Sequence, residues 1–586
     1  MSMTSRRDFL NQSLVLLAAG RAGSTPVQTA AGPSFYRQLV QSNNESIPAV
    51  IRELAAQQAR QNIRRIGTHL TTLAAGFYAP ESALRSSESL IAPMEQASRI
   101  LLEAQHGDGT IDSGNLNSPP DTGFVLETVC SAMSVLRRAS DPRLARILEN
   151  LTRFVQAGGD ALVTGGVHTP NHRWVICSAL ARIHSLLPAS KYVSRIDDWL
   201  GEGIDIDGDG QFSERSTGIY SRVTDEALIA VARLLNRPNL LDHVRKNLDM
   251  MVYYLHPDGE VETVGSRRQD QFMTSFISNY YLEYRYLAIR DRNPLYAAVV
   301  GMIEQTLAER VKNANPLIHF LDEPLLKNDL PVGGALPADY ARVFPNSALA
   351  RIRRDQVSAT VYGGSDWPMG VGSGLASNPT FLTFRKGKAV LESVRMGADF
   401  FSEGVFRSMG LVADGNRYSL SQRFDVPYYL PLPKGERNAQ GDYPLTPARD
   451  ERFWSKLNFP RRQMGQIQTL DQKITIVEDR GAFELRFDVS GHKGVPVAIE
   501  LGFRPGGKLE GAVEQRREAT YLKDGMGVYR VGQDAITFGP GIAQHERIDL
   551  SGSSYKAHGA PLRSGGLCVY ITGFTPLQRV LTITAA

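Results

Sequence analysis

Residues 381–396 read FLTFRKGKAVLESVRM, and this stretch marks where the chain changes its architecture. Apolar and polar residues alternate on both sides of Lys386-Gly387, which is the pattern of two strands joined by a tight turn. Residues 473–489, KITIVEDRGAFELRFDV, repeat the arrangement around Arg480-Gly481. Further alternating segments follow, so residues 347–586 are predicted to form a large antiparallel β-sandwich.

Upstream of this region the spacing is helical. From about residue 34 to residue 310, apolar residues recur every three to four positions, as on the buried face of an amphipathic helix. Clusters of Gly, Pro and Asp separate these segments, so residues 32–315 are predicted to form stacked helical hairpins. Residues 316–346 hold several prolines and no clear period, and are predicted to be a linker. The expected fold class is α+β with two large domains.

The composition is that of a globular protein. The 586 residues include 65 Lys and Arg against 61 Asp and Glu, a formal charge of +4. Because nucleic-acid binders carry a concentrated excess of basic residues, this balance argues against nucleic acid as a partner. Hydrophobic residues make up 42% of the chain, too many for a disordered one. Three cysteines exclude a disulfide framework and a four-cysteine zinc module.

The amino terminus has the layout of a bacterial signal peptide. Residues 5–10, SRRDFL, resemble the twin-arginine export motif closely. The apolar stretch from Leu14 to Ala19 is far shorter than the roughly 20 residues that span a bilayer, so no membrane anchor is expected. Residues 1–31 are therefore predicted to direct a folded protein to the periplasm or to the medium.

Asn171, His172 and Trp174 form the first candidate site, at the start of a helical segment. A helix start favours negative charge, so an amide and an imidazole there are suited to an anionic ligand. Asn171 follows Thr-Pro and is equally suited to cap the helix. Asp121, in a loop between two helical segments, either lines a cleft or belongs to a helix end.

The loop that begins near Asp205 carries a metal-like pattern. Asp205, Asp207 and Asp209 have the alternate spacing of a calcium loop, but its twelfth position holds Ser216 instead of Glu. Calcium binding and a plain polar turn both remain open. No other metal and no organic cofactor is expected.

Tyr220 and Arg222 follow in the same stretch and suggest acid–base chemistry. A tyrosine acts as a base only when its phenolate is stabilised, because its free pKa is near 10, and a neighbouring arginine supplies that stabilisation. Arg267 and Arg268 are suited to holding carboxylates or sulfates through paired hydrogen bonds, or are solvated surface residues. His256 opens an HPDG turn that is either a binding loop or a plain turn.

Taken together, these parts resemble the heparinase II/III-like polysaccharide lyases, which include alginate lyases of similar build. In that family an α/α toroid is followed by an antiparallel sandwich. Residues 209–220, DGQFSERSTGIY, are similar to the family pattern Asp-Gly-x-x-x-Glu-x-Ser-x-x-Tyr, with one extra residue before Tyr220. The pair Asn171-His172 and the stretch FPNSALARIRRDQVSATVYGG at 344–364 also resemble the family.

The resemblance implies cleavage of a uronate-containing polysaccharide by β-elimination. It assigns Asn171 to the uronate carboxylate, His172 to the same group or to a base, and Tyr220 to the general acid and the base. Elimination removes the proton next to a carboxylate and expels the glycosidic oxygen. Amide, imidazole and Arg groups should therefore meet at the developing enolate, with Arg222 among them.

The chain departs from the family at residues 374–384, GLASNPTFLTF, where many members have a His-rich motif. A tyrosine of the sandwich, Tyr362, Tyr428 or Tyr429, is the candidate replacement. The residues expected to bind substrate are Asp121, Trp174, Glu214, His256, Arg267, Arg268 and Tyr362.

Two other functions remain open. A glycoside hydrolase on a similar helical toroid would need two carboxylates across a cleft, such as Glu214 with Asp121 or Asp270. A non-catalytic protein would use the same aromatic and Arg residues only to hold a glycan. A lyase product absorbs in the ultraviolet because it contains a new C=C bond, and a hydrolase product does not.

Overall fold

The structure is a computed structural model that describes residues 32–56, 62–366, 374–401, 404–449, 453–517, 519–548 and 566–586. The predicted export signal at residues 1–31 lies outside these ranges. Within them, no helix combines the length and the apolar character that crossing a bilayer requires.

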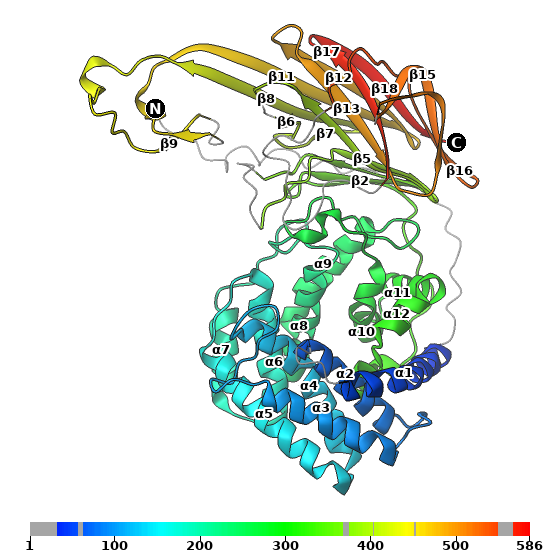
Figure 1. The fold of residues 1–586 in the computed structure, drawn as a ribbon. Coiled ribbons are helices and arrows are strands. Elements are labelled where there is room, and N and C mark those ends of the chain that lie inside the picture. Colours follow the sequence, from blue (N-terminus) through cyan, green and yellow to red (C-terminus); the bar gives the residue numbers. More distant parts are fainter. Residues whose placement is uncertain are drawn as a thin grey trace.

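The amino-terminal domain is helical, as predicted, and its helices form two layers. Contacts join α2, α4, α6, α8 and α10 in that order, and α3, α5 and α7 pack outside them. Figure 1 shows the resulting arc of hairpins below the sheet. The bounds are α1 Gly32–Ala55, α2 Ile63–Tyr78, α3 Ile91–Glu103, α4 Pro119–Ala139, α5 Ala145–Thr164, α6 Pro170–Leu186, α7 Ser190–Leu200, α8 Tyr220–Leu234, α9 Leu241–Tyr254, α10 Tyr281–Arg290, α11 Pro294–Thr306, α12 Ala308–Ala314 and α13 Leu317–Asp322.

The inner helices begin where the sequence supplies start signals. Pro119 and Pro170 occupy the first helical positions of α4 and α6, where a missing N–H costs nothing. Ser118 caps α4, because its hydroxyl accepts a hydrogen bond from the Asp121 backbone N–H at 3.2 Å. Thr169, and not Asn171, is the N-cap residue of α6. Asn171 is thus free of the capping role that the sequence left open.

The carboxy-terminal domain is a large, mostly antiparallel sheet. Its main path runs β1-β2-β3-β4-β5-β13-β17-β15-β16-β18-β12-β11-β8-β7, with β14 beside β15 and β6 beside β5. The bounds are β1 Asp339–Phe344, β2 Leu349–Arg354, β3 Val357–Tyr362, β4 Leu382–Lys386, β5 Ala389–Ala398, β6 Gly404–Val405, β7 Val412–Asp414, β8 Arg417–Tyr429, β9 Thr446–Pro447, β10 Trp454–Ser455, β11 Met464–Asp479, β12 Ala482–Gly491, β13 Pro496–Phe503, β14 Lys508–Arg516, β15 Ala519–Val531, β16 Asp534–Gly539, β17 Leu567–Phe574 and β18 Leu577–Ala585.

Hydrogen bonding joins these strands, apart from the separate pair β9 and β10, into one curved sheet and does not divide them into the two sheets of a sandwich. Strands β4 and β5 nevertheless contact β16, so distant parts of the path face each other around one apolar core. Both predicted hairpins are present. In the β11–β12 hairpin, Asp479 pairs with Ala482, and Arg480 and Gly481 both have positive φ, as a two-residue turn with the right twist requires.

The sheet sits on the helical domain through β2 to β5 (Figure 1). The region predicted to be a linker contains α13, a short 3-10 helix at Pro324–Lys327, and β1. Glu260 joins the two domains, because its carboxylate accepts paired hydrogen bonds from Arg385 at 2.6 and 2.7 Å and from Arg504 at 2.8 and 3.0 Å. This network fixes the sheet over the helix ends that carry the candidate site.

Candidate active site

The candidate active site lies where four inner helices begin. Arg64 stands in the first turn of α2, Asp121 in that of α4, Asn171 in that of α6, and Tyr220 is the first residue of α8. A hydrogen bond and ion pair between Arg64 and Asp121 ties the starts of α2 and α4 together. Helix starts carry partial positive charge, so this end of the domain favours an anionic ligand.

Asn171 and Arg268 are held by one carboxylate, that of Glu214. The Asn171 side-chain N–H donates to Glu214 Oε2 at 2.7 Å, and the Asn171 backbone N–H donates to the same oxygen at 3.2 Å. Arg268 forms an ion pair with Glu214 Oε1. All three side chains are largely buried, so Glu214 sets the position of an amide and of a cation in the site.

Tyr220 lies between the cation and a second amide. The Arg268 guanidinium carbon is 4.1 Å from the centre of the Tyr220 ring. The Gln269 side-chain N–H donates to the Tyr220 hydroxyl at 2.9 Å. The Tyr220 backbone N–H donates to the Ser216 hydroxyl at 3.0 Å. The phenol therefore has a fixed orientation and meets a positive charge and an N–H donor.

His172 is a neutral imidazole in this site at neutral pH. The pKa of His172 is lowered to about 4, chiefly by burial and also by the nearby His168 and Arg268, while Asp121 opposes this effect. Its ring packs edge-on against Phe124 and His168. Among the described residues, its buried Nδ1 has no hydrogen-bond partner. The imidazole can therefore accept or donate a proton without first losing a structural contact at that atom.

Asp270 has a structural position behind the site. It is fully buried, and its carboxylate accepts hydrogen bonds from the hydroxyls of Ser216 at 2.9 Å and Ser266 at 2.6 Å and from the Gly218 N–H at 2.9 Å. These contacts shape the loop that precedes Tyr220. Burial raises the pKa of Asp270, and the hydrogen bonds counteract that rise.

Two predicted site residues lie away from this cluster within the helical domain. Arg222 donates to Glu226 at 2.7 Å and is 3.9 Å from Glu283, so it is Arg268 that lies over Tyr220. Residues two apart on a helix point to different sides, which explains the difference. Trp174 is buried and donates its indole N–H to Asp205 at 3.2 Å.

Three further candidates lie at the contact between the domains. His256 is fully buried with its Nδ1 2.9 Å from the Ser358 hydroxyl. Tyr362 is buried, and burial raises the pKa of its hydroxyl. Arg267 donates two hydrogen bonds, at 2.8 and 2.9 Å, to the carboxylate of Asp366. Tyr428 and Tyr429 are the last two residues of β8.

The aspartates of the calcium-like loop have separate protein partners. Asp205 accepts hydrogen bonds from Arg173 and Trp174, Asp207 accepts them from backbone N–H groups of its own loop, and Asp209 accepts them from residues 346 and 347. Across the residues that the structure describes, no group of three or more His, Cys, Asp or Glu side chains is arranged to hold a metal ion.

Sequence reasoning missed Arg64, Phe124, His168 and Gln269. Gln269 directly follows the Arg267-Arg268 pair, so a search for hydrogen-bonding neighbours of that pair would have found it. Arg64 looks like any surface arginine on a helix, and only the packing of α2 against α4 brings it to Asp121.

Comparison with solved structures places the fold among polysaccharide lyases. Heparinase III matches with a TM-score of 0.54 at 10% identity, over 90% of this chain and 77% of its own. Chondroitin AC lyase of Streptomyces coelicolor A3 matches with 0.50 at 14%, over 94% and 79%. Paenibacillus xanthan lyase matches with 0.54 at 9%, over 93% and 57%. No family model and no curated protein sequence matches the chain.

The resemblance read from the sequence is thus confirmed at the level of the fold. The chain has the architecture of these lyases, a helical domain followed by a large, mostly antiparallel sheet. At sequence identities of 9–14%, the comparison shows a shared fold and nothing more.

Proposed function

We propose that this protein is an exported polysaccharide lyase that cleaves a uronate-containing glycan by β-elimination. The fold supports the class of enzyme, and the chondroitin AC lyase with that fold was solved with chondroitin sulphate bound. The observation that carries the proposal is the environment of Tyr220, where a guanidinium faces the ring and an amide N–H meets the hydroxyl.

The proposed chemistry begins at the uronate carboxylate. The second N–H of Asn171, which donates to the Thr169 hydroxyl at 3.2 Å, is available to a substrate carboxylate that replaces this contact. Neutral His172 provides a further hydrogen-bond donor, and Arg268 provides the positive charge. Together they stabilise the negative charge that develops on the carboxylate as the adjacent C–H bond breaks.

Tyr220 carries the proton in this scheme. Its oxygen takes the proton from the carbon next to the carboxylate, and the C–O bond to the leaving sugar breaks as the C=C bond forms. The same hydroxyl then gives the proton to the departing glycosidic oxygen. Arg268 and Gln269 stabilise the negative charge that the tyrosine oxygen carries before the first transfer and again after the second.

The contacts of the carboxylates favour the lyase over the hydrolase. Glu214 is bound by Asn171 and Arg268, Asp121 by Arg64 and Asn115, and Asp270 by three donors. A hydrolase requires one carboxyl group that delivers a proton and one that acts as a nucleophile or base. Each of these three instead holds other groups of the site in place.

The test is the ultraviolet absorbance of the product from Tyr220→Phe and from the unchanged protein on a panel of uronate glycans. We expect Tyr220→Phe to lower the rate by about 10²–10⁴-fold with substrate affinity and stability unchanged. Tyr78→Phe, at the opposite end of an inner helix, is the matched control and should keep full activity. Undiminished product formation by Tyr220→Phe would remove the tyrosine from the mechanism.

The export proposal rests on residues 5–10, SRRDFL. A fusion of the first 31 residues to a reporter should appear in the periplasm of cells with a working twin-arginine system. Replacing Arg6 and Arg7 by Lys should leave the reporter in the cytoplasm. Unchanged export of the doubly substituted fusion would contradict the assignment.

A further inference from the structure

A cavity of about 400 Å³ opens beside Tyr220, on the side of α8 that faces α10. Its lining includes Gly218 and Ile219, the two residues before Tyr220, and Arg310 of α12. The volume lies within the roughly 300–1,000 Å³ that ligand sites occupy. The cavity therefore has room for a sugar residue, and two of its lining residues directly precede Tyr220 in the chain.

The charges on the cavity wall are positive. Arg222 and Arg310 both line it, and none of the described residues in its lining is Asp or Glu. Arg222 is partly neutralised by Glu226, at 2.7 Å. Arg310 is exposed and lies over the Phe276 ring at 3.6 Å, and none of the described carboxylates forms an ion pair with it. An arginine stacked on an aromatic ring keeps its N–H groups available for an anion.

Ser278 adds a hydroxyl group to the same wall. The residue is 9% exposed and lines the cavity. His319 is a second polar wall residue, and burial lowers the pKa of its imidazole, which is then neutral at neutral pH. The cavity thus combines positive charge with hydrogen-bonding groups that suit a sugar.

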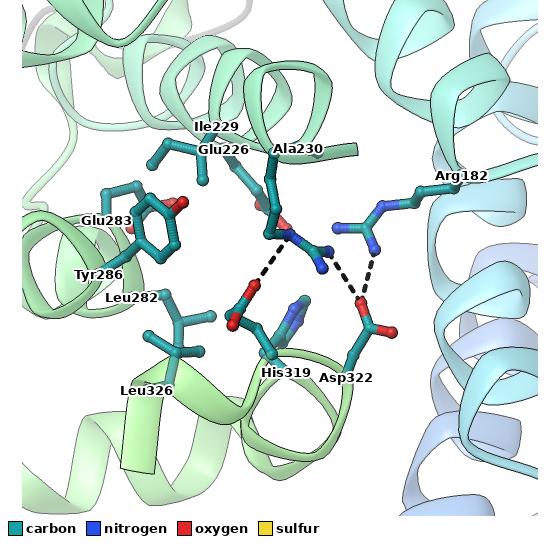
Figure 2. A pocket seen from close by; sticks show the side chains of 12 residues that line it. Arg182, Glu226, Ile229, Ala230, Leu282, Glu283, Tyr286, His319, Asp322 and Leu326 are labelled. Atoms are coloured by element: carbon teal, nitrogen blue, oxygen red, sulfur yellow. Dashed lines mark hydrogen bonds and ion pairs between the residues drawn. The ribbon is translucent and has the colours of Figure 1, made fainter. Parts of the chain in front are cut away.

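A neighbouring cavity is smaller, and its arginines are paired with a carboxylate. It shares Leu282 and His319 with the first cavity and measures about 50 Å³, too small for a sugar residue. Figure 2 shows that Arg182, in its lining, binds Asp322. Arg233 binds the same carboxylate, so the arginines of this inner space already have acidic partners.

We propose that this cavity is a subsite for an anionic substituent of the sugar next to the reacting uronate, with Arg310 as the residue that selects for it. The substituent is a carboxylate in a polyuronate or a sulfate in a sulfated glycosaminoglycan, since both offer oxygens to a guanidinium. The proposal rests on the proposed function for its substrate class. It adds a preference for glycans that carry a negative charge on adjacent sugars.

The experiment measures the dissociation constant of size-defined oligosaccharides by calorimetry in the Tyr220→Phe background, so that no turnover interferes. We expect Arg310→Ala to weaken binding roughly tenfold, as the loss of one charged hydrogen bond does. We expect Ser278→Ala to weaken it roughly threefold, the loss for a neutral one. Arg290→Ala, an exposed arginine at the other end of α10, is the matched control and should leave the constant unchanged.

Three ligands separate the two sources of the charge: an unsulfated polyuronate, a sulfated glycosaminoglycan, and its desulfated form. A tenfold effect of Arg310→Ala that disappears on desulfation assigns the site to sulfate, and an effect on the polyuronate assigns it to carboxylate. Equal dissociation constants for Arg310→Ala and Arg290→Ala on all three ligands overturn the subsite. If Arg310 controls binding but the unchanged protein yields no unsaturated product, the subsite stands and the lyase proposal fails.

Discussion

Replacing Glu214 by Gln tests whether this carboxylate positions the site or performs the chemistry. The Glu214 carboxylate accepts hydrogen bonds from the Asn171 side-chain N–H at 2.7 Å and from the Asn171 backbone N–H at 3.2 Å. It also forms an ion pair with Arg268. The amide of Gln keeps one acceptor oxygen but removes the charge. If Glu214 is a positioning residue, the substitution should therefore affect stability and activity together.

The size of the effect follows from these contacts. A charged hydrogen bond contributes about 1.5–3 kcal/mol and a neutral one about 1 kcal/mol, and Arg268 would be left largely buried without its counter-ion. We expect Glu214→Gln to lose roughly 2–4 kcal/mol in the free energy of unfolding. Misplacement of Asn171 and Arg268 should lower kcat about 10–100-fold without abolishing the unsaturated product.

The assay combines urea unfolding with product absorbance for Glu214→Gln, Arg268→Gln and the double variant. The double-mutant cycle should show a coupling energy above about 1 kcal/mol. Glu202→Gln removes the exposed partner of Arg173 and should cost less than about 1 kcal/mol. Complete loss of activity in Glu214→Gln at unchanged stability and unchanged Arg268 coupling would refute the positioning role and favour a hydrolase.

Two further predictions concern pH and the domain contact. The pKa of His172 is about 4 in the folded protein and 6.5 for the free group, so the unfolded chain takes up the proton first as pH falls. Protonation of His172 should therefore reduce the free energy of unfolding between about pH 6.5 and about pH 4. His172→Gln should flatten that part of the curve of stability against pH. Burial raises the pKa of Glu260, but its hydrogen bonds and charge contact with Arg385 outweigh this effect and lower the pKa to about 2. Ionised Glu260 should therefore stabilise the fold above pH 4.5, and this stabilisation should be lost as pH falls towards 2. Glu260→Gln should therefore cost about 3–5 kcal/mol in urea unfolding at neutral pH, and a cost below 1 kcal/mol would contradict the role given to the contact with Arg385 and Arg504.

The fold could be predicted from the sequence because its signals are local. The alternation around Lys386 and around Arg480 predicted two hairpins that the structure contains. Local alternation does not say whether strands make two sheets or one, because that depends on which distant edges pair. The pairing of β5 with β13 and of β13 with β17 joins the strands into one sheet, and no pattern within a strand encodes it.

The candidate site was predictable in part, because local sequence signals mark some of its residues. Asn171 and His172 stood out because they follow Thr-Pro at a predicted helix start, and Tyr220 stood out beside Arg222 in a stretch similar to the family pattern. Arg222 was a reasonable partner for Tyr220 by proximity in sequence, yet its side chain turns to Glu226. Arg268, 48 positions along the chain from Tyr220, lies over the ring instead because the loop before α10 folds back onto α8.

The sequence by itself determined the change from helices to strands, the hairpin turns and the residue types available for chemistry, since each depends on neighbours a few positions apart. The tertiary structure alone decided which of those residues meet. Inner helices that begin at one end of the domain bring Arg64, Asp121, Asn171 and Tyr220 together, and Glu214 then fixes Asn171 and Arg268. Charges act over a few ångströms in space, and chain separation does not measure that distance.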